Sequence, residues 1–480
     1  MLCGSLIWNS SVIFRVMKRM KIASLFLLLC SVAILSCRKD SFITSPDARI
    51  TITVDTLKYD TVFASTGSVT QSFKIINENN QKLRLNAVKL MGGSSSAYKI
   101  NIDGSMGPEL NNIEIEANDS LYIFAQVTIN PSAANLPFIV RDSIQVSYNG
   151  QTRFVQMEAW GQNAHFFRDK QVLTNETWNN DLPYVILGYL HVGPGATLTI
   201  NKGCRLYFHA DAPMIVDGTL QVSGLKDSVD RVYFQGDRLD APYKDYPASW
   251  PGIYFLGSSL NNVLNYAVVK NAYQAVAVED PATNANPKLT LNECIIDNGY
   301  DAGIIASNSS IRARNCLISN CGKNVYLVKG GNYQFTHCTV VSVSNRFIQH
   351  REPVLTVSNY ANNSSVNLDA VFRNCIFWGE SGIVKDEVVV FKNGNTTFNV
   401  NFDYNLWKVE TTPPNITSNQ IITNQPPLFD SVNSFENYYD FRLQAASPAI
   451  NKGVAAGVTI DLDGRTRPVG LPDLGCYERQ

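Results

Sequence analysis

Five side chains in the second half of the chain belong to the types that polar catalysis uses. They are Glu293, Asp297, Arg312, Arg314 and His337. Either arginine could neutralise a substrate carboxylate, and His337 could accept the neighbouring proton because histidine titrates at about pH 6.5. The two acids could instead serve as the paired carboxylates of a hydrolase. The simpler interpretation is a solvated row of mixed charge at turns.

A second group of candidates lies in residues 237–250, which interrupt the strand pattern and are expected to protrude as a loop. Tyr243, Tyr246 and Trp250 stand there beside carboxylates, and flat aromatic faces suit the apolar faces of sugar rings. For Trp250, the alternative of packing into the core is favoured. Arg373 is a further candidate for contacting a ligand.

Neither a metal centre nor a cofactor is predicted. Asp461, Asp463 and Gly464 begin like a calcium loop, but the third carboxylate and the distal glutamate are missing, so we expect a turn. The chain carries 40 basic and 41 acidic residues, a net charge of −1. This balance gives no basic surplus for binding nucleic acid.

The elements that must position these side chains follow a repeated pattern, apolar-x-apolar-x-x-Cys-x-apolar. Its cysteine recurs every 22 residues, at Cys294, Cys316 and Cys338. A copy at Cys375 follows an insertion, and further copies replace the cysteine by Asn405 or Ala267. This period, with strands and no helical pattern, predicts one coil of a parallel β-helix per repeat. A leucine-rich horseshoe has a similar period, but its leucine consensus is absent.

Two residues separate the apolar pairs in each copy and mark a bend between two strands. We expect these bend residues to point outward in one exposed column, with Arg312 and Asp297 at neighbouring outward positions. That column would contain Glu293, Arg314, His337, Arg373 and Asp403.

Seven cysteines follow Cys37. A small apolar side chain fits an inner stack, so packed free thiols are favoured over disulfides. Metal binding would require histidine or paired cysteines at tetrahedral spacing; Cys316 and Cys321 alone lie close in sequence, and no histidine accompanies them.

Residues 48–163 have the pattern of about seven short alternating strands. Asn149 and Gly150 stand between the last two, and Asn-Gly is the strongest short hairpin signal. The chain is therefore expected to be all-β, with an immunoglobulin-like β-sandwich at 48–163, a linker at 164–182 and a β-helix at 183–480. Hydrophobic residues make up 45% of the chain and charged residues 17%, which favours packed cores over disorder.

The amino terminus has the pattern of a secretory leader. Basic residues precede an apolar run at 22–35, which is too short to span a bilayer as a helix. The run ends Ile-Leu-Ser-Cys at 34–37, which resembles the lipobox of bacterial lipoproteins. The resemblance implies that residues 1–36 are removed and that Cys37 is lipidated. Met17 or Met20 is a better translation start than Met1, because residues 1–16 add nothing that a signal peptide needs. Residues 37–47 would then be the tether, and the membrane would be a partner through the lipid anchor.

Residues 183–480 are similar to right-handed parallel β-helix proteins of the pectate-lyase-like superfamily, above all lipoproteins of Bacteroidetes. The matching blocks are Trp-Pro-Gly-Ile-Tyr at 250–254, residues 266–271, and a closing segment at 447–453, 461–468 and 473–478. The resemblance implies the fold and a location at the outer membrane, on the cell surface. It does not imply one activity, because this fold hosts lyases, hydrolases and esterases.

The hydrolase and lyase motifs of that superfamily are absent from the chain. Non-catalytic binding of a glycan or another surface ligand is therefore the leading functional hypothesis. A lyase or glycoside hydrolase acting on an acidic polysaccharide is the first alternative, and a structural or adhesive rod is the second.

Overall fold

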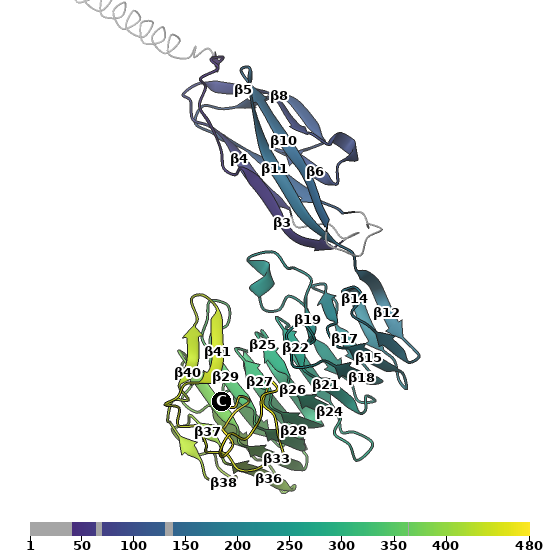
Figure 1. Ribbon diagram of the computed structural model, residues 1–480, viewed down its shortest axis with the longest axis vertical. Coiled ribbons are helices and arrows are strands. Elements are labelled where there is room, and N and C mark those ends of the chain that lie inside the picture. Colours follow the sequence, from purple (N-terminus) through teal and green to yellow (C-terminus); the bar gives the residue numbers. More distant parts are fainter. Residues whose placement is uncertain (1–40, 64–69, 130–137, 363) are drawn as a thin grey trace, which may run out of the picture. The chain divides into compact units, whose positions relative to one another are not determined.

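Strands account for nearly all of the regular structure in the computed structural model (Figure 1), which confirms the expected all-β class. The structure describes residues 41–480 except 64–69, 130–137 and 363. Cys37 and the expected leader therefore lie outside the described residues. The chain divides near residue 160 into two units, each of which is described by itself.

The first unit contains two largely antiparallel sheets. One runs β1-β5-β10-β11-β3, with β8 on β5, and the other runs β2-β4-β9-β6-β7. The first sheet is made of β1 (Phe42–Ile43), β3 (Thr56–Phe63), β5 (Lys82–Leu90), β8 (Glu109–Ile115), β10 (Phe138–Tyr148) and β11 (Gln151–Gln162). The second is made of β2 (Ile50–Ile52), β4 (Gln71–Asn77), β6 (Tyr98–Ile102), β7 (Ser105–Met106) and β9 (Ser120–Val127). A short 3₁₀ turn, η1 (Gly93–Ser95), follows β5.

Alternating strand residues form the core of this unit. Tyr59 on β3 and Tyr98 on β6 are buried, with ring centroids 5.8 Å apart, so side chains of both sheets meet there. The predicted hairpin is confirmed, because β10 and β11 are joined by Asn149 and Gly150, with φ of 45° and 80°. Both residues adopt the positive φ that a two-residue hairpin turn requires.

The second unit is dominated by one sheet that joins 26 of the described strands, from β12 to β39, all paired in parallel wherever the register is given. Each strand pairs with the strand that follows one coil later, an arrangement consistent with a parallel β-helix (Figure 1). The pairings form three stacks, named A, B and C.

Stack A holds β13 (Glu176–Trp178), β15 (Thr197–Asn201), β18 (Thr219–Ser223), β21 (Asn262–Asn265), β24 (Leu289–Asn292), the second parts of β26 (Ala302–Arg314) and β28 (Lys323–Thr336), β33 (Leu368–Arg373), β36 (Phe398–Asp403) and β38 (Thr417–Asn419). Stack B holds the first parts of β12 (His165–Val172) and β14 (Tyr184–Val192), then β16 (Arg205–Phe208), β19 (Val232–Gly236), β22 (Ala267–Lys270), β25 (Ile295–Asp297), β27 (Leu317–Ser319), β29 (Thr339–Val343), β34 (Ile376–Glu380), β37 (Leu406–Trp407) and β39 (Ile422–Thr423).

Stack C holds the remaining parts of β12, β14, β26 and β28, with β17 (Met214–Val216), β20 (Ile253–Phe255), β23 (Gln274–Glu279), β30 (Leu355–Ser358) and β35 (Val388–Phe391). Outside the stacks lie the 3₁₀ turn η2 (Tyr243–Asp245), the hairpin β31 (Tyr360–Ala361) with β32 (Ser364–Ser365), and the hairpin β40 (Phe429–Asn433) with β41 (Tyr438–Leu443).

The register confirms the repeated pattern. In stack A, the first apolar positions of five successive copies are Cα partners: Leu289, Ile311, Tyr333, Ala370 and Val400. The cysteines of the pattern are at most 1% exposed and belong to the inner apolar cluster. All seven cysteines of the described chain are free and buried, so the prediction of packed thiols is confirmed.

The coils begin earlier than expected. Residues 164–182 were predicted to be a linker, but His165–Val172 forms β12 on β14, and Glu176–Trp178 forms β13 on β15. Trp178 stacks on Tyr184 with centroids 4.5 Å apart, so this segment closes the inner cluster at its first coil. These strands lack the cysteine pattern, which is why the sequence reading missed them.

Residues 444–480, named the C-terminal strap, lie along the side of the coils. Apolar strap residues such as Leu462, Leu474 and Tyr477 form a second buried cluster with outward side chains of stack B. The strap reaches several coils, since the Arg231 guanidinium donates to the Leu462 carbonyl (2.7 Å) and Gly475 N donates to the Asn374 carbonyl (2.8 Å). It therefore covers the bend between stacks A and B.

Candidate functional site

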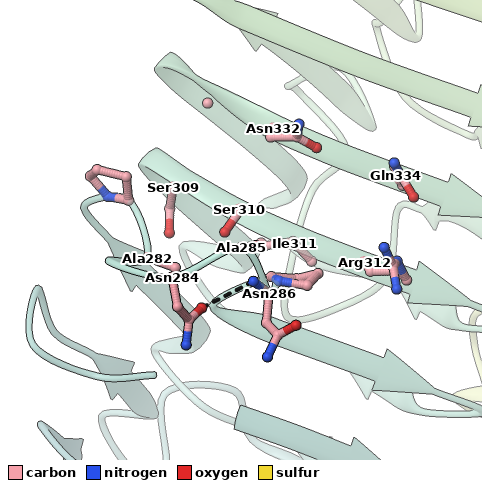
Figure 2. A pocket seen from close by; sticks show the side chains of 13 residues that line it. Ala282, Asn284, Ala285, Asn286, Ser309, Ser310, Ile311, Arg312, Asn332 and Gln334 are labelled. Atoms are coloured by element: carbon pink, nitrogen blue, oxygen red, sulfur yellow. Dashed lines mark hydrogen bonds between the residues drawn. The ribbon is translucent and has the colours of Figure 1, made fainter. Parts of the chain in front are cut away.

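A polar pocket, named the Arg312 pocket, opens on the outer side of stack A (Figure 2). Its volume is about 470 Å³. One wall is the loop 281–287 between β23 and β24, and the other side is formed by outward residues of β26 and β28. The polar side chains that line it are Asn284, Asn286, Ser309, Ser310, Arg312, Asn332 and Gln334.

The loop wall exists because this coil is longer than its neighbours. Ala267 and Cys294 occupy the same pattern position but are 27 residues apart, against 22 in the next two coils. The side-chain amides of Asn284 and Asn286 both donate to the Asn261 side-chain oxygen, at 3.1 and 3.0 Å. The loop is thus held at a defined distance from the strands.

The buried Lys288 fixes the base of the same loop. Its ammonium donates to three carbonyls, those of Leu256 (3.1 Å), Gly257 (2.8 Å) and Glu279 (2.6 Å), and burial lowers the pKa of this lysine. Its backbone N–H donates to the Ser310 hydroxyl (2.9 Å), which belongs to the pocket. A buried charge must be satisfied in this way, so the loop has little freedom to shift.

The floor of the pocket is a regular parallel register. On successive strands, the Cα partners are Thr290, Arg312 and Gln334. Two residues before Arg312, Ser310 is the Cα partner of Asn332. Arg312 and Gln334 are exposed. Gly331 is required where it stands, because its φ is +124° and a Cβ there would lie 2.4 Å from the Ser309 carbonyl oxygen.

Arg312 gives the pocket its electrostatic character. Within the described part of the chain, no carboxylate lies within 4 Å of its guanidinium. The other lining groups are neutral amides, hydroxyls and apolar atoms. A guanidinium fork without a partner suits a carboxylate or sulfate group, which it can bind through two parallel hydrogen bonds.

Two of the expected exposed residues, Glu293 and His337, are buried, so the prediction of one exposed column is wrong. They are 2% and 1% exposed. The bend has two kinds of position, and its second residue adopts positive φ in every copy: Tyr266, Glu293, Asn315, His337, Asn374 and Tyr404. This conformation directs the second residue under the strap, while the first residue stays outside.

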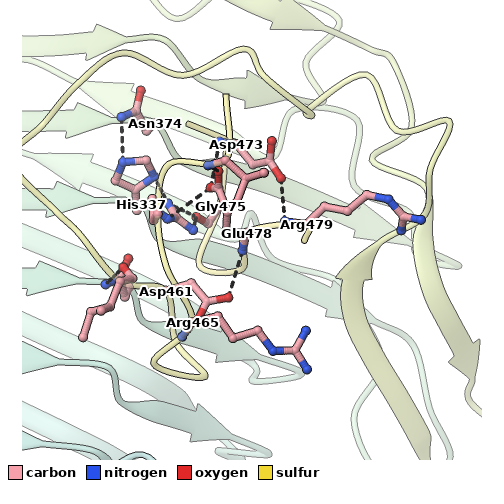
Figure 3. Close-up of polar contacts among 12 residues, drawn as sticks. His337, Asn374, Asp461, Arg465, Asp473, Gly475, Glu478 and Arg479 are labelled. Carbon is pink, nitrogen blue, oxygen red and sulfur yellow. Dashed lines mark hydrogen bonds and ion pairs between the residues drawn. The ribbon is translucent and has the colours of Figure 1, made fainter. Parts of the chain in front are cut away.

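His337 is part of a polar network beneath the strap (Figure 3). Its Nε2 lies 2.9 Å from the side-chain nitrogen of Asn374, and its Nδ1 contacts the Arg467 guanidinium. Burial, and then the charge of Arg467, hold the pKa of His337 well below its usual value. The Arg467 guanidinium also lies 3.3 Å from Glu478, and both side chains are fully buried.

Glu293 occupies the same column two coils earlier. Its carboxylate accepts from the Asn315 amide (3.1 Å) and lies 3.4 Å from Arg314 Nε. Burial raises the pKa of Glu293. Arg314 is itself a first-position residue and is exposed, as expected.

The remaining candidates lie apart from the pocket. Arg373 and Asp403, also first-position residues, pair with each other at 2.9 Å and are half-buried. Asp297 lies on β25 in stack B, beyond the bend, where its carboxylate accepts from Ser319 Oγ (2.7 Å) and burial raises its pKa. The five proposed catalytic residues therefore do not share one cleft.

The aromatic candidates divide into one core residue and two exposed ones. Trp250 is fully buried, stacks on Phe208 with centroids 4.4 Å apart, and donates to the Lys270 carbonyl (2.9 Å). The core position favoured for Trp250 is therefore confirmed, and its candidate role in ligand binding is wrong. Tyr243 and Tyr246 are 42% and 39% exposed on the 237–250 loop.

The predicted turn at Asp461 is confirmed. Its carboxylate accepts from the backbone N–H groups of Asp463, Arg465 and Glu478, at 3.0, 2.8 and 3.0 Å. Among the described residues, no three histidine, cysteine or acidic side chains form a group that could hold a metal ion. In the same part of the chain, no helix has both the length and the apolar composition to cross a bilayer.

No protein-family model matches the chain, and no curated protein matches it. Solved structures share short stretches. A family 123 glycoside hydrolase from Clostridium perfringens is 14% identical over 26% of each chain, with a TM-score of 0.19. The PapD-like domain of human CEP192 is 8% identical over 26% of this chain and 96% of its own, with a TM-score of 0.17. These likenesses are too low to carry an inference about this chain.

Proposed function

We propose that this chain is a cell-envelope lipoprotein whose second unit binds an acidic saccharide without catalysis. In this proposal the first unit is an immunoglobulin-like spacer, and the coils are a right-handed parallel β-helix of the pectate-lyase-like type. The lipobox-like sequence ending at Cys37 supports the anchor at the outer membrane. The antiparallel sheets of the first unit and the parallel register of the second support the two domain types.

The observation that carries the proposal is the unpaired Arg312 in a pocket of neutral hydrogen-bonding groups. Amides and hydroxyls match the hydroxyls of a sugar, and the free guanidinium matches a uronate carboxylate or a sulfate. A pocket of about 470 Å³ is large enough for a short saccharide.

The lining of the pocket favours binding over catalysis. Of the residues that form it, Arg312 is the sole titratable one. Abstraction of a sugar proton or hydrolysis requires a base or a pair of carboxylates beside the substrate. Glu293 and His337, which could have supplied them, are covered by the strap.

A glycan array tests the proposal with the protein expressed from residue 38, which omits the lipid. We expect uronate-containing or sulfated glycans to be retained, and Arg312→Gln to weaken retention by about 10-fold or more, since a hydrogen bond to a charged group contributes about 1.5–3 kcal/mol. Arg314→Gln is the matched control, because this arginine already has Glu293 at 3.4 Å. Equal retention by both variants would refute the pocket.

The same preparation separates the alternatives. Absorbance of unsaturated uronate in the mixture, or release of reducing ends, would replace the binding proposal by a lyase or hydrolase. Retention of no glycan at all would favour the structural or adhesive rod. The anchor is tested by Cys37→Ser in the full chain, which should move the protein from the membrane fraction to the soluble fraction.

A further inference from the structure

Exposed tyrosines gather at the bend between stacks B and C. Four of them, named the tyrosine face, have exposed fractions of 39–53%: Tyr243, Tyr246, Tyr273 and Tyr300. Tyr273 and Tyr300 stand just before β23 and β26, on adjacent coils, and their rings stack with centroids 5.9 Å apart. Tyr243 and Tyr246 lie on the 237–250 loop, with centroids 5.2 Å apart.

The loop is fastened to the same bend that carries the other pair. The Asn271 side-chain amide donates to the Lys244 carbonyl (2.6 Å), and the Asn298 amide donates to the Asp245 carbonyl (3.0 Å). Asn271 and Asn298 precede Tyr273 and Tyr300 by two residues each. All four tyrosines are therefore held at one corner of the coils.

A second insertion contacts the loop through an aromatic ring. Phe347 lies between β29 and β30, and its ring is 5.3 Å from that of Tyr246. Its backbone is fixed, because Phe347 N and Ile348 N both donate to the Asn345 side-chain oxygen at 2.8 Å. Further along the same insertion, the buried His350 pairs with Glu387 at 2.8 Å. The aromatic rings are thus pre-positioned, and binding a ligand orders few further groups.

Two charged groups beside these rings are already neutralised. Arg238, which lies 3.7 Å over the Tyr243 ring, pairs with Asp240 through two contacts of 2.8 and 3.0 Å. Asp301, next to Tyr300, accepts from Lys323 (2.8 Å) and Gln274 (2.7 Å). This is the opposite of the Arg312 pocket, where the cation has no carboxylate partner among the residues that the structure describes.

We infer that the tyrosine face is a second saccharide-binding site, and that it takes neutral sugar chains. The rigid aromatic rings offer flat apolar faces to the C–H faces of pyranose rings, and their hydroxyls, with the fixed Asp301 and Gln274, offer hydrogen bonds at the rim. Arg238 and Asp301 are already paired, so neither of these two groups draws an acidic sugar to the rings. This inference is independent of the Arg312 pocket and survives if that pocket binds nothing.

Affinity electrophoresis tests the inference, because it detects weak binding to a polysaccharide cast in a native gel. The probes are hydroxyethylcellulose, xyloglucan, galactomannan and laminarin, with polygalacturonate as the acidic comparison. We expect at least one neutral probe to retard the protein. The double variant Tyr273→Ala with Tyr300→Ala should raise the apparent dissociation constant for that probe at least tenfold.

Two controls make the result specific. Phe391→Ala removes an aromatic side chain of similar exposure, 46%, on β35, and should leave the retardation unchanged. Arg312→Gln should also leave the neutral probe unaffected while weakening any retardation by polygalacturonate. If none of the four neutral probes retards the protein, or if the double variant is retarded as strongly as the unchanged protein, the tyrosine face is not a saccharide site.

Discussion

The strapped bend and the Arg312 pocket both place arginine and asparagine side chains on neighbouring coils, with opposite results. At the bend, Glu293, His337 and Arg467 are covered, and each has partners inside the protein. In the pocket, Arg312 has water on one side and no carboxylate within 4 Å among the described residues. The difference shows that the type of a side chain does not decide its role here; the cover above it does.

This difference has an energetic counterpart. Buried charges have lost their hydration, so removing one partner leaves the other both desolvated and unpaired. An exposed, unpaired arginine keeps its hydration, and its removal costs the folded state little. Variants at the two places should therefore separate stability from binding.

The largest effect is expected from Arg467→Ala. Its side chain is fully buried beside Glu478 at 3.3 Å, and breaking a buried pair costs about 3–5 kcal/mol. The measurement is urea unfolding of the second unit, followed by tryptophan fluorescence. Arg465→Ala is the control, because that side chain is 51% exposed and lies 3.9 Å from Asp463, so its loss should cost less than about 1 kcal/mol. Equal losses for the two variants would mean that the strap is not held by its buried charges.

A smaller effect is expected from pH. Because burial and Arg467 lower the pKa of His337, the unfolded chain takes up this proton at higher pH than the folded chain does. The His337 contribution to stability is therefore lost as the pH falls below the ordinary value of 6.5, by up to about 1.4 kcal/mol for each unit by which folding lowers the pKa.

His337→Asn isolates that effect, since asparagine occupies the same positive-φ position in the adjacent coil at Asn374. Burial raises the pKa of Glu293, Asp473 and Glu478, which opposes the histidine on acidification but is common to both proteins. Between pH 7.5 and 5.5, the unfolding midpoint of the unchanged protein should fall relative to that of the variant. Parallel pH profiles would contradict the assignment.

The smallest effect on stability is expected from Arg312→Gln. Since Arg312 has no carboxylate partner in the described part of the chain, this variant should unfold within about 0.5 kcal/mol of the unchanged protein, although we expect it to weaken acidic-glycan binding. Urea unfolding and the glycan array on the same preparation check both halves. A large loss of stability would show that Arg312 is structural and would remove the contrast with the bend.

The pairing that stacks the inward apolar residues could be predicted from the sequence, because successive coils repeat the same pattern. The cysteines at 294, 316 and 338 mark positions that must stack, and the structure pairs the strands accordingly. The hairpin at Asn149 and Gly150 was equally local, because its turn depends on two residues.

The cover of the bend could not be predicted in this way. The segment at 447–478 was expected to close the β-helix, but nothing in its sequence says which side of the coils it lies against. Contacts such as Asn374 with Val454 join residues 80 positions apart. Without them, the sequence does not show that the second bend position, held by Glu293 and His337, is covered while the first, held by Arg314, is exposed.

One feature of the sequence could have predicted the Arg312 pocket. The spacing of 27 residues between Ala267 and Cys294 indicates an insertion in that coil. Pro281 and Pro287 stand at its two ends. The position of Arg312 facing that insertion follows from the register, because Thr290 and Arg312 are Cα partners. That no described carboxylate lies beside Arg312 could not be predicted, because this depends on side chains that are distant in the sequence.

The strap has a consequence for synthesis. It comes from the end of the chain, yet it covers apolar outward side chains of coils completed much earlier, among them Leu317, Ile376 and Leu406. A polypeptide that stops before residue 444 would leave these apolar side chains in contact with water, and His337 would lose its contact with Arg467. We expect products that lack the strap to aggregate or to be degraded, because their apolar row has no cover.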